Sequence, residues 1–277
     1  MNSIPGNAPA ATTAATGHIS SQFDADLEDI RTRMLQMGGM VEAQVRAAVK
    51  IYDGAGSIDY ETIRETEKRV NQSEIELDDA CTHLIVRRQP AAGDLRLVMS
   101  IVKTITDLER IGDEADKIAR IAHAMRQRGP LSLRGFSDIH VAANMAAGML
   151  KDALDAFARL DTALAQRIVM QDPEIDDEFA SVLRQLVTFM MEDPRIISNA
   201  LDIIWIAKAI ERIGDHAQNI AEYVIFVAKG TDVRHASRQP LMRHWQAEHS
   251  GPPLPHPRAL LLKTKITHGT RHHYSVG

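Results

Sequence analysis

The sequence has one cysteine, few aromatic residues and no long apolar run, and each shortage excludes a class of protein. Because Cys81 has no second cysteine to pair with, an intramolecular disulfide and a cysteine-rich zinc site are excluded, and a reducing compartment is expected. No stretch approaches the ~18 consecutive apolar residues of a membrane span. Residues 1–18 lack the basic start and the apolar run of a secretory signal. We therefore expect a cytoplasmic protein with no direct membrane insertion.

The motifs of several enzyme classes are also missing. The chain has no glycine-rich phosphate loop, no Gly-x-Ser-x-Gly motif and no Cys/His nucleophile arrangement. No glutamate is followed three positions later by histidine, which is the usual ligand pair of carboxylate-bridged di-iron enzymes. We therefore expect a protein that is not an enzyme.

The composition favours helices and an acidic body. Aromatic residues make up only 4% of the chain, whereas alanine, leucine, isoleucine and methionine are plentiful, which suits the packing of helix on helix. Residues 234–277 carry seven Lys or Arg and one acidic residue, while the rest of the chain carries 25 basic and 36 acidic residues. An acidic body argues against nucleic acid as a partner and suits the binding of cations.

The string Glu-Arg-Ile-Gly-Asp occurs at residues 109–113 and again at 211–215. The match continues in the same register on both sides, from Ile101 and Ile203 to Ala119 and Ala221, so the chain contains an internal repeat. Apolar residues recur every three or four positions around each string, as in amphipathic helices. The expected helices cover residues 23–52, about 59–88, 94–126, 136–160, 162–191 and 195–229, with the fifth bent or divided at Pro173.

These helices predict an all-α fold of two tandem three-helix bundles, residues 19–128 and 129–234. The flanking segments, 1–18 and the Pro- and His-rich 235–277, are predicted to be disordered tails. The middle helices of the two bundles are expected to correspond at an offset of 100, with Glu74-Ile75 matched to Glu174-Ile175. Two adjacent glycines in the first helix, Gly38 and Gly39, indicate a close helix contact or a local bend.

The acidic residues of the repeat predict metal binding. Glu109, Asp113 and Asp116 lie within roughly 60° of one another on a helix, and several clustered oxygen ligands suit hard or borderline cations. Acidic pairs on exposed helices are often only solvated or neutralised by Arg and Lys, but their repetition at matched positions favours a role. The candidate ligands are Glu109, Asp113 and Asp116 in the first bundle and Glu211, Asp215 and Asn219 in the second.

Neighbouring positions refine this prediction. The second site is expected to be the weaker, because Gln218 stands where Asp116 stands in the first copy. His216 adjoins Asp215, although a histidine on an exposed helix is more often solvated. The glycine of each string, Gly112 and Gly214, indicates close helix packing, because glycine within a helix is otherwise unfavourable. A small basic patch around a predicted turn is a candidate contact for an anion or a partner, and it consists of Arg87, Arg88 and Arg96.

Several segments together resemble the PhoU family of phosphate-specific transport system accessory proteins. The resemblance rests on the two repeated strings and on residues 18–23, 88–96 and 229–235, and it covers about residues 18–235. It implies two tandem three-helix bundles that form a homodimer and bind divalent or ferric metal ions through the acidic motifs, with iron, zinc, manganese and magnesium all open. The implied ligands are Glu109, Asp113, Asp116, Glu211, Asp215 and, less closely matched, Asn219.

The same resemblance implies a negative regulator of the phosphate-starvation response. Such a protein would connect the phosphate ABC transporter, through its ATPase subunit, to a membrane sensor histidine kinase. The chain departs from the family pattern at Gln218 and in the segment after His235. Two alternatives stay open from the residues alone, namely a metalloenzyme that uses the acidic sites for hydrolysis or redox chemistry, and a helical adaptor that is indifferent to metal.

Overall fold

The computed structural model describes residues 13–54, 59–128 and 137–230. These residues form helices and no strand, which confirms the predicted all-α fold. The elements are α1 (Thr13–Asp53), α2 (Tyr60–Arg88), α3 (Ala92–Gln127), α4 (Ser137–Arg159), α5 (Thr162–Glu192), a 3-10 turn η1 (Pro194–Ile196) and α6 (Ile197–Lys229). The predicted tail 235–277 lies outside the described residues. So does most of the predicted tail 1–18, although α1 begins within it, at Thr13.

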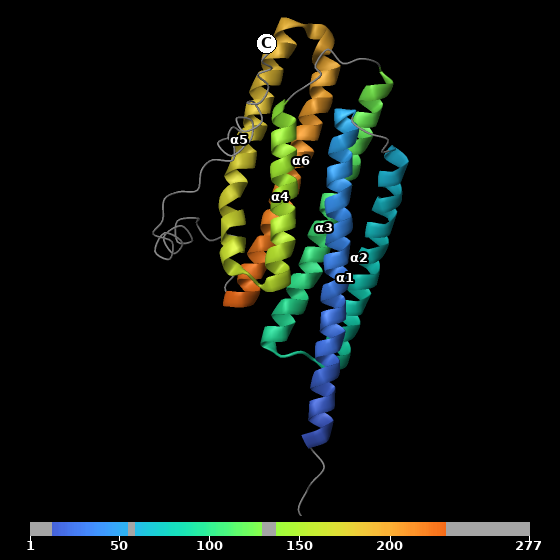
Figure 1. Cartoon of the computed structure of the whole chain (residues 1–277), viewed down its shortest axis with the longest axis vertical. Coiled ribbons are helices and arrows are strands. Elements are labelled where there is room, and N and C mark those ends of the chain that lie inside the picture. Colours follow the sequence, from blue (N-terminus) through green and yellow to red (C-terminus); the bar gives the residue numbers. More distant parts are fainter. Residues whose placement is uncertain (1–12, 55–58, 129–136, 231–277) are drawn as a thin grey trace, which may run out of the picture. The chain divides into compact units, whose positions relative to one another are not determined.

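The helices form two three-helix bundles (Figure 1). Helices α1, α2 and α3 pack against one another, as do α4, α5 and α6. In addition, α3 packs along α6 and α1 contacts α4, so the first and third helices of each bundle join the two repeats. Helices α2 and α5 lie on the outer sides of this arrangement. The predicted tandem repeat of three-helix bundles is therefore confirmed.

Helices α3 and α6 run in opposite directions where they meet. Near the end of α3, Arg128 donates a hydrogen bond of 3.2 Å to the Ser198 hydroxyl near the start of α6. Further back on α3, Asp107 accepts one of 3.1 Å from Asn219, which is well advanced along α6. Each half of α3 consequently lies beside the opposite half of α6.

Local sequence explains several helix ends. The Asp161 side chain caps α5 by accepting hydrogen bonds of 3.0 Å from the backbone amides of Ala163 and Leu164. At the end of α6, Gly230 adopts a left-handed conformation with φ of 71°, which glycine adopts at little cost. Pro173 lies inside α5, which continues to Glu192, so the helix is not divided there.

The core consists mainly of aliphatic side chains, and one glycine brings the repeats together within it. Met34, Met37 and Val41 of α1 are fully buried at helical spacing. A Cβ atom placed on Gly38 would lie 2.5 Å from Cδ2 of Leu154 on α4, whereas one on Gly39 would meet nothing within 4 Å. The close helix contact predicted for this pair of glycines is therefore made by Gly38.

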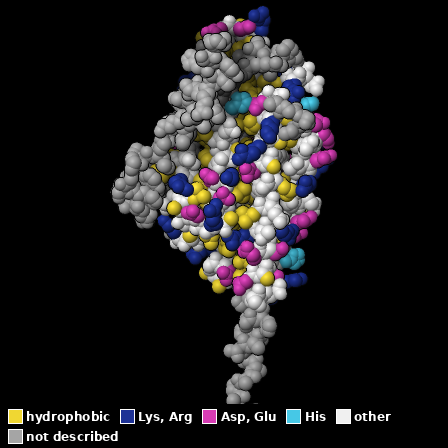
Figure 2. Space-filling model, in the orientation of Figure 1, with side chains coloured by type: hydrophobic (Ala, Val, Ile, Leu, Met, Phe, Trp, Pro, Cys, Tyr) yellow, Lys and Arg dark blue, Asp and Glu magenta, His cyan; other side chains and the backbone are white. Residues whose placement is uncertain are grey.

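None of the described helices has an apolar stretch long enough to cross a membrane. On the face shown in Figure 2, the basic and acidic side chains of the described residues are interspersed. This face accordingly presents no continuous basic surface of the kind that binds nucleic-acid phosphates.

Candidate metal centres

A compact group of carboxylates lies between α5 and α6 in the second repeat. Asp176 of α5 and Glu211 and Asp215 of α6 each contribute one carboxylate oxygen, and these oxygens all lie within 4.8 Å of one another. Within the described ranges, no other set of three His, Cys, Asp or Glu residues meets this distance. Glu211 and Asp215 were predicted from the sequence, whereas Asp176 was not.

The negative charge of this group is only partly compensated. Lys208 donates a hydrogen bond of 2.5 Å to Oε1 of Glu211, but Oε2 of Glu211 accepts none from any described residue. Burial, and after it the charges of Glu211 and Asp176, raises the pKa of Asp215, while Lys208 and His216 act in the opposite direction. A cation placed among these oxygens would offset their mutual repulsion.

The three acidic residues predicted on α3, Glu109, Asp113 and Asp116, lie close enough to α2 for their charges to shift the pKa values of its carboxyl groups. Burial raises the pKa of Glu67 on α2, and the charges of Asp113, Asp116 and Glu109 on α3 raise it further. Burial and then the charge of Glu109 likewise raise the pKa of Glu74. The three residues predicted on α3 are thus brought together with carboxylates of α2, although in a looser group than in the second repeat.

Several oxygen atoms of this first group have no hydrogen-bond partner among the described residues. They are Oδ1 of Asp116, Oε1 of Glu67 and Oδ1 of Asn71. Burial is the main cause that raises the pKa of both Glu109 and Asp116. A buried polar atom without a partner lowers the free energy of unfolding by about 1–3 kcal/mol. A bound metal ion would give oxygen atoms of this kind a partner.

The glycine of each repeated string explains how the middle helix comes close to the acidic face. A Cβ on Gly112 would lie 3.0 Å from Oε2 of Glu67 and 3.5 Å from Val70. A Cβ on Gly214 would lie 2.8 Å from Cδ1 of Ile175. Both glycines therefore face the middle helix of their own bundle, as predicted, and their missing side chains let its carboxylates approach.

These contacts correct the predicted register of the middle helices. Val70 and Ile175 occupy equivalent places against the glycines, which makes the offset 105 and not 100. The proposed match of Ile75 with Ile175 is wrong, because Ile75 is 59% exposed and Ile175 only 1%. In the corrected register Asn71 corresponds to Asp176, so the first site has an amide where the second has a carboxylate. This difference explains why the compact carboxylate group lies in the repeat that was expected to hold the weaker site.

Polar residues next to the second site are engaged elsewhere. The Asn219 amide donates to Oδ1 of Asp107 on α3 at 3.1 Å, and Nδ1 of His216 lies 2.7 Å from the same oxygen. Gln218 donates to Glu222 at 2.9 Å. The structure thus places Asn219 at the contact of α6 with α3, and the expectation that His216 is merely solvated is wrong.

The residues present fit a hard or borderline cation. In the second repeat the donors are Asp176, Glu211 and Asp215; in the first they are drawn from Glu109, Asp113 and Asp116 on α3 with Glu67, Asn71 and Glu74 on α2. All are oxygen donors, which Mg²⁺, Mn²⁺, Zn²⁺ and iron accept. The described residues bring no His or Cys into the compact group.

The fold and these acidic faces define a class of protein, a tandem pair of three-helix bundles with carboxylates between the second and third helix of each. A family model described as the PhoU domain matches the chain twice, over residues 34–122 and 139–224. These two matches fall on the two repeats. The chain belongs to the PhoU family.

Relatives and solved structures agree with this assignment. A PhoU homolog of Pseudomonas aeruginosa is 50% identical over 220 residues, covering 79% of this chain and 90% of the relative. The Escherichia coli K12 protein is 46% identical over 220 residues, with the same coverage. The crystal structure of PhoU from Pseudomonas aeruginosa matches with a TM-score of 0.73 and 48% identity, over 76% of this chain and 100% of that one. PhoU from Streptococcus pneumoniae matches with a TM-score of 0.67 and 25% identity, over 76% and 99%.

The names of these relatives indicate the kind of protein that the family contains. Both sequence relatives are called phosphate-specific transport system accessory proteins. The chain is thus a member of a family of accessory proteins and is not an enzyme, as its sequence predicted.

Proposed function

We propose that the protein is a cytoplasmic negative regulator of the phosphate-starvation response and a modulator of phosphate uptake. It acts as a helical adaptor between a phosphate ABC transporter, through the ATPase subunit, and a sensor histidine kinase. The observation that carries this proposal is the double match to the PhoU domain, which spans both bundles. The names of the relatives, accessory proteins of a phosphate-specific transport system, support the link to the transporter.

An exposed apolar stripe supports the role of an adaptor. On α6, Ile197, Leu201 and Trp205 follow one another at intervals of four and are 41%, 46% and 55% exposed. Exposed apolar residues at matched positions of α3, Leu95 and Met99, lie 102 positions before Ile197 and Leu201. Tryptophan and large aliphatic residues in one row are typical of surfaces that other proteins cover. We assign the α6 stripe to a protein partner, and a homodimer remains an expectation from the family.

Bound metal would supply a second element of this role. Bound cations would cancel the repulsion between the clustered carboxylates and hold the middle helix of each bundle to the third helix. They would be held by Asp176, Glu211 and Asp215 in the second bundle and by the acidic residues between α2 and α3 in the first. The carboxylates would then present a fixed surface to a partner. Iron, zinc, manganese and magnesium are all compatible with these donors.

The adaptor proposal is tested by replacing the chromosomal copy with a Leu201→Gln, Trp205→Gln double variant. In phosphate-replete cells we expect derepression of a phosphate-starvation reporter, and loss of the kinase and the transporter ATPase from an affinity purification read by mass spectrometry. Ile75→Gln, which changes an exposed apolar residue on α2, serves as the matched control. If the double variant folds, represses and retains both partners as the wild type does, the stripe is not the docking surface.

A further inference from the structure

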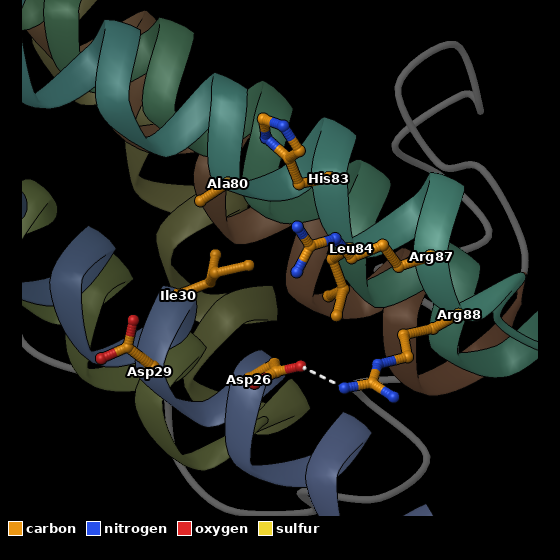
Figure 3. A pocket seen from close by; sticks show the side chains of 8 residues that line it. All are labelled: Asp26, Asp29, Ile30, Ala80, His83, Leu84, Arg87 and Arg88. Carbon is orange, nitrogen blue, oxygen red and sulfur yellow. Dashed lines mark hydrogen bonds and ion pairs between the residues drawn. The ribbon is translucent and has the colours of Figure 1, made fainter. Parts of the chain in front are cut away.

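A cleft lies between α1 and α2 near the end of α2 (Figure 3). Its volume is about 240 Å³, and its apolar part is formed by Ile30, Ala80 and Leu84. Ile30 and Leu84 belong to the buried core, so the cleft reaches down to it. Pockets for whole small molecules usually enclose ~300–1,000 Å³. This cleft therefore suits a part of a larger ligand, such as a side chain of a protein.

The two carboxylates of the cleft are already paired with arginines, whereas one arginine of the cleft makes no direct ion pair. Arg88 donates a hydrogen bond of 3.1 Å to Asp26, and Arg33 lies 3.7 Å from Asp29. Arg87 is exposed and makes no ion pair or side-chain hydrogen bond within the described part of the chain. Its guanidinium extends over the cleft between His83 and Ile30 (Figure 3). The cleft thus offers an arginine that makes no direct ion pair, although its charge acts on Asp26, beside an apolar surface.

The hydrogen bond of His83 determines what its ring can offer to a ligand. Nδ1 lies 2.8 Å from the backbone carbonyl oxygen of Asp79. Because a carbonyl oxygen only accepts, Nδ1 carries the proton, and Nε2 of the neutral ring is left as an acceptor. A ligand with an N–H donor close to a carboxylate would match both His83 and Arg87.

We propose that this cleft binds a short acidic segment of a partner protein. An aliphatic side chain of the segment packs on Ile30 and Leu84, an adjacent Glu or Asp pairs with the Arg87 guanidinium, and a backbone N–H donates to Nε2 of His83. A phospholipid surface fits less well, because a bilayer is flat at this scale and does not enter a cleft that reaches down to Ile30 and Leu84. The contact uses none of the residues of the metal centres or of the α6 stripe, so it can fail independently of the proposed function.

The test measures fluorescence anisotropy of labelled peptides with the full-length protein. One pool of octapeptides carries Leu-Glu or Leu-Asp at the centre, and a matched pool carries Leu-Lys. We expect the acidic pool to bind about tenfold or more tightly than the basic pool, and Arg87→Glu to remove this preference. Arg87→Lys should retain part of it, because lysine keeps the charge without the bidentate geometry. Ala80→Phe, which fills the apolar part without changing charge, should also abolish binding.

Arg69→Glu is the matched control, since Arg69 is an exposed arginine of the same helix outside the cleft. Circular dichroism verifies that each variant keeps its helix content. Equal binding of the two pools, binding that survives Arg87→Glu, or no binding of the acidic pool at about 1 mM peptide would each overturn the proposal. Binding of phosphatidylglycerol vesicles that depends on Arg87, without binding of the acidic pool, would assign the cleft to a membrane and overturn it as well.

Discussion

Gly38 of α1 and Leu154 of α4 meet where the two repeats join, and a Cβ on Gly38 would lie only 2.5 Å from Cδ2 of Leu154. The two helices can lie this close because residue 38 has no side chain. The contact belongs to the continuous interface that also includes α3 and α6. The relative placement of the two acidic faces therefore depends on a residue that carries no functional group.

This contact predicts opposite effects for two adjacent glycines. Gly38→Ala should lower the free energy of unfolding by about 1–3 kcal/mol, because the methyl group overpacks against Leu154. Gly39→Ala, at a position with nothing within 4 Å, should raise it by up to about 1 kcal/mol through helix propensity. Urea denaturation of both variants measures the difference. Similar values for the two would show that Leu154 yields without cost.

The carboxylate group of Asp176, Glu211 and Asp215 predicts how removing one carboxylate affects metal binding. Asp215→Asn should lower the metal content of the purified protein, because it leaves two carboxylates, Asp176 and Glu211, where three lay within 4.8 Å. Elemental analysis after mild dialysis gives the stoichiometry. Asp177→Asn, on the same helix as Asp176 but outside the group, should leave the content unchanged. No metal in the wild type would favour an adaptor that is indifferent to metal.

The first centre predicts a corresponding loss in the other bundle. Replacing Glu109 and Asp113 together with Ala should remove the metal bound by the first repeat and leave the helix content intact, because both residues lie on the face of α3 turned to acidic residues of α2. Metal content and circular dichroism of the double variant test this. A stoichiometry equal to that of the wild type would exclude these two residues as ligands.

The raised pKa of Glu67 predicts how stability varies with pH. An acid whose pKa is higher in the folded state holds its proton longer there, so the folded state loses stability as the pH rises from about 4, the ordinary value for glutamate, through the raised pKa. In metal-free protein, Glu67→Gln should be at least as stable as the wild type at pH 7 and equal to it near pH 4. Urea titrations across this range provide the measurement, with Glu65→Gln, an exposed neighbour, as control. A variant that is less stable than the wild type at pH 7 would contradict the sign.

The polar contact between α3 and α6 predicts a loss of stability. Asp107 is buried and meets both His216 and Asn219 through Oδ1. Asp107→Ala should cost about 1–3 kcal/mol of unfolding free energy, because it leaves the Asn219 amide and the His216 ring without their partner. Thr106→Ala, at the exposed position before it, should stay within about 0.5 kcal/mol. Thermal and urea unfolding measure the stability of the two variants. If Asp107→Ala were as stable as Thr106→Ala, water would have replaced the Asp107 carboxylate.

The amino-acid sequence by itself determined the fold class, the internal repeat and the acidic faces of α3 and α6. These features depend on periodicity along a single helix and on the recurrence of one string. Both can be recognised without knowing which helices pack against one another. The candidate ligands Glu109, Asp113, Asp116, Glu211, Asp215 and Asn219 were predicted in this way. The predicted ends of the helices from α2 onward agree with the structure to within a few residues.

Only the tertiary structure decided which residues face one another across neighbouring helices. The axial register of α5 against α6 is set by the contact of Ile175 with Gly214, and this contact brings Asp176 to Glu211 and Asp215. The same packing directs Asn219 and His216 to Asp107 on α3. A shift of a few residues along a helix changes such partners without altering the apolar periodicity of either helix, so the local pattern leaves the register undetermined and side-chain packing selects it.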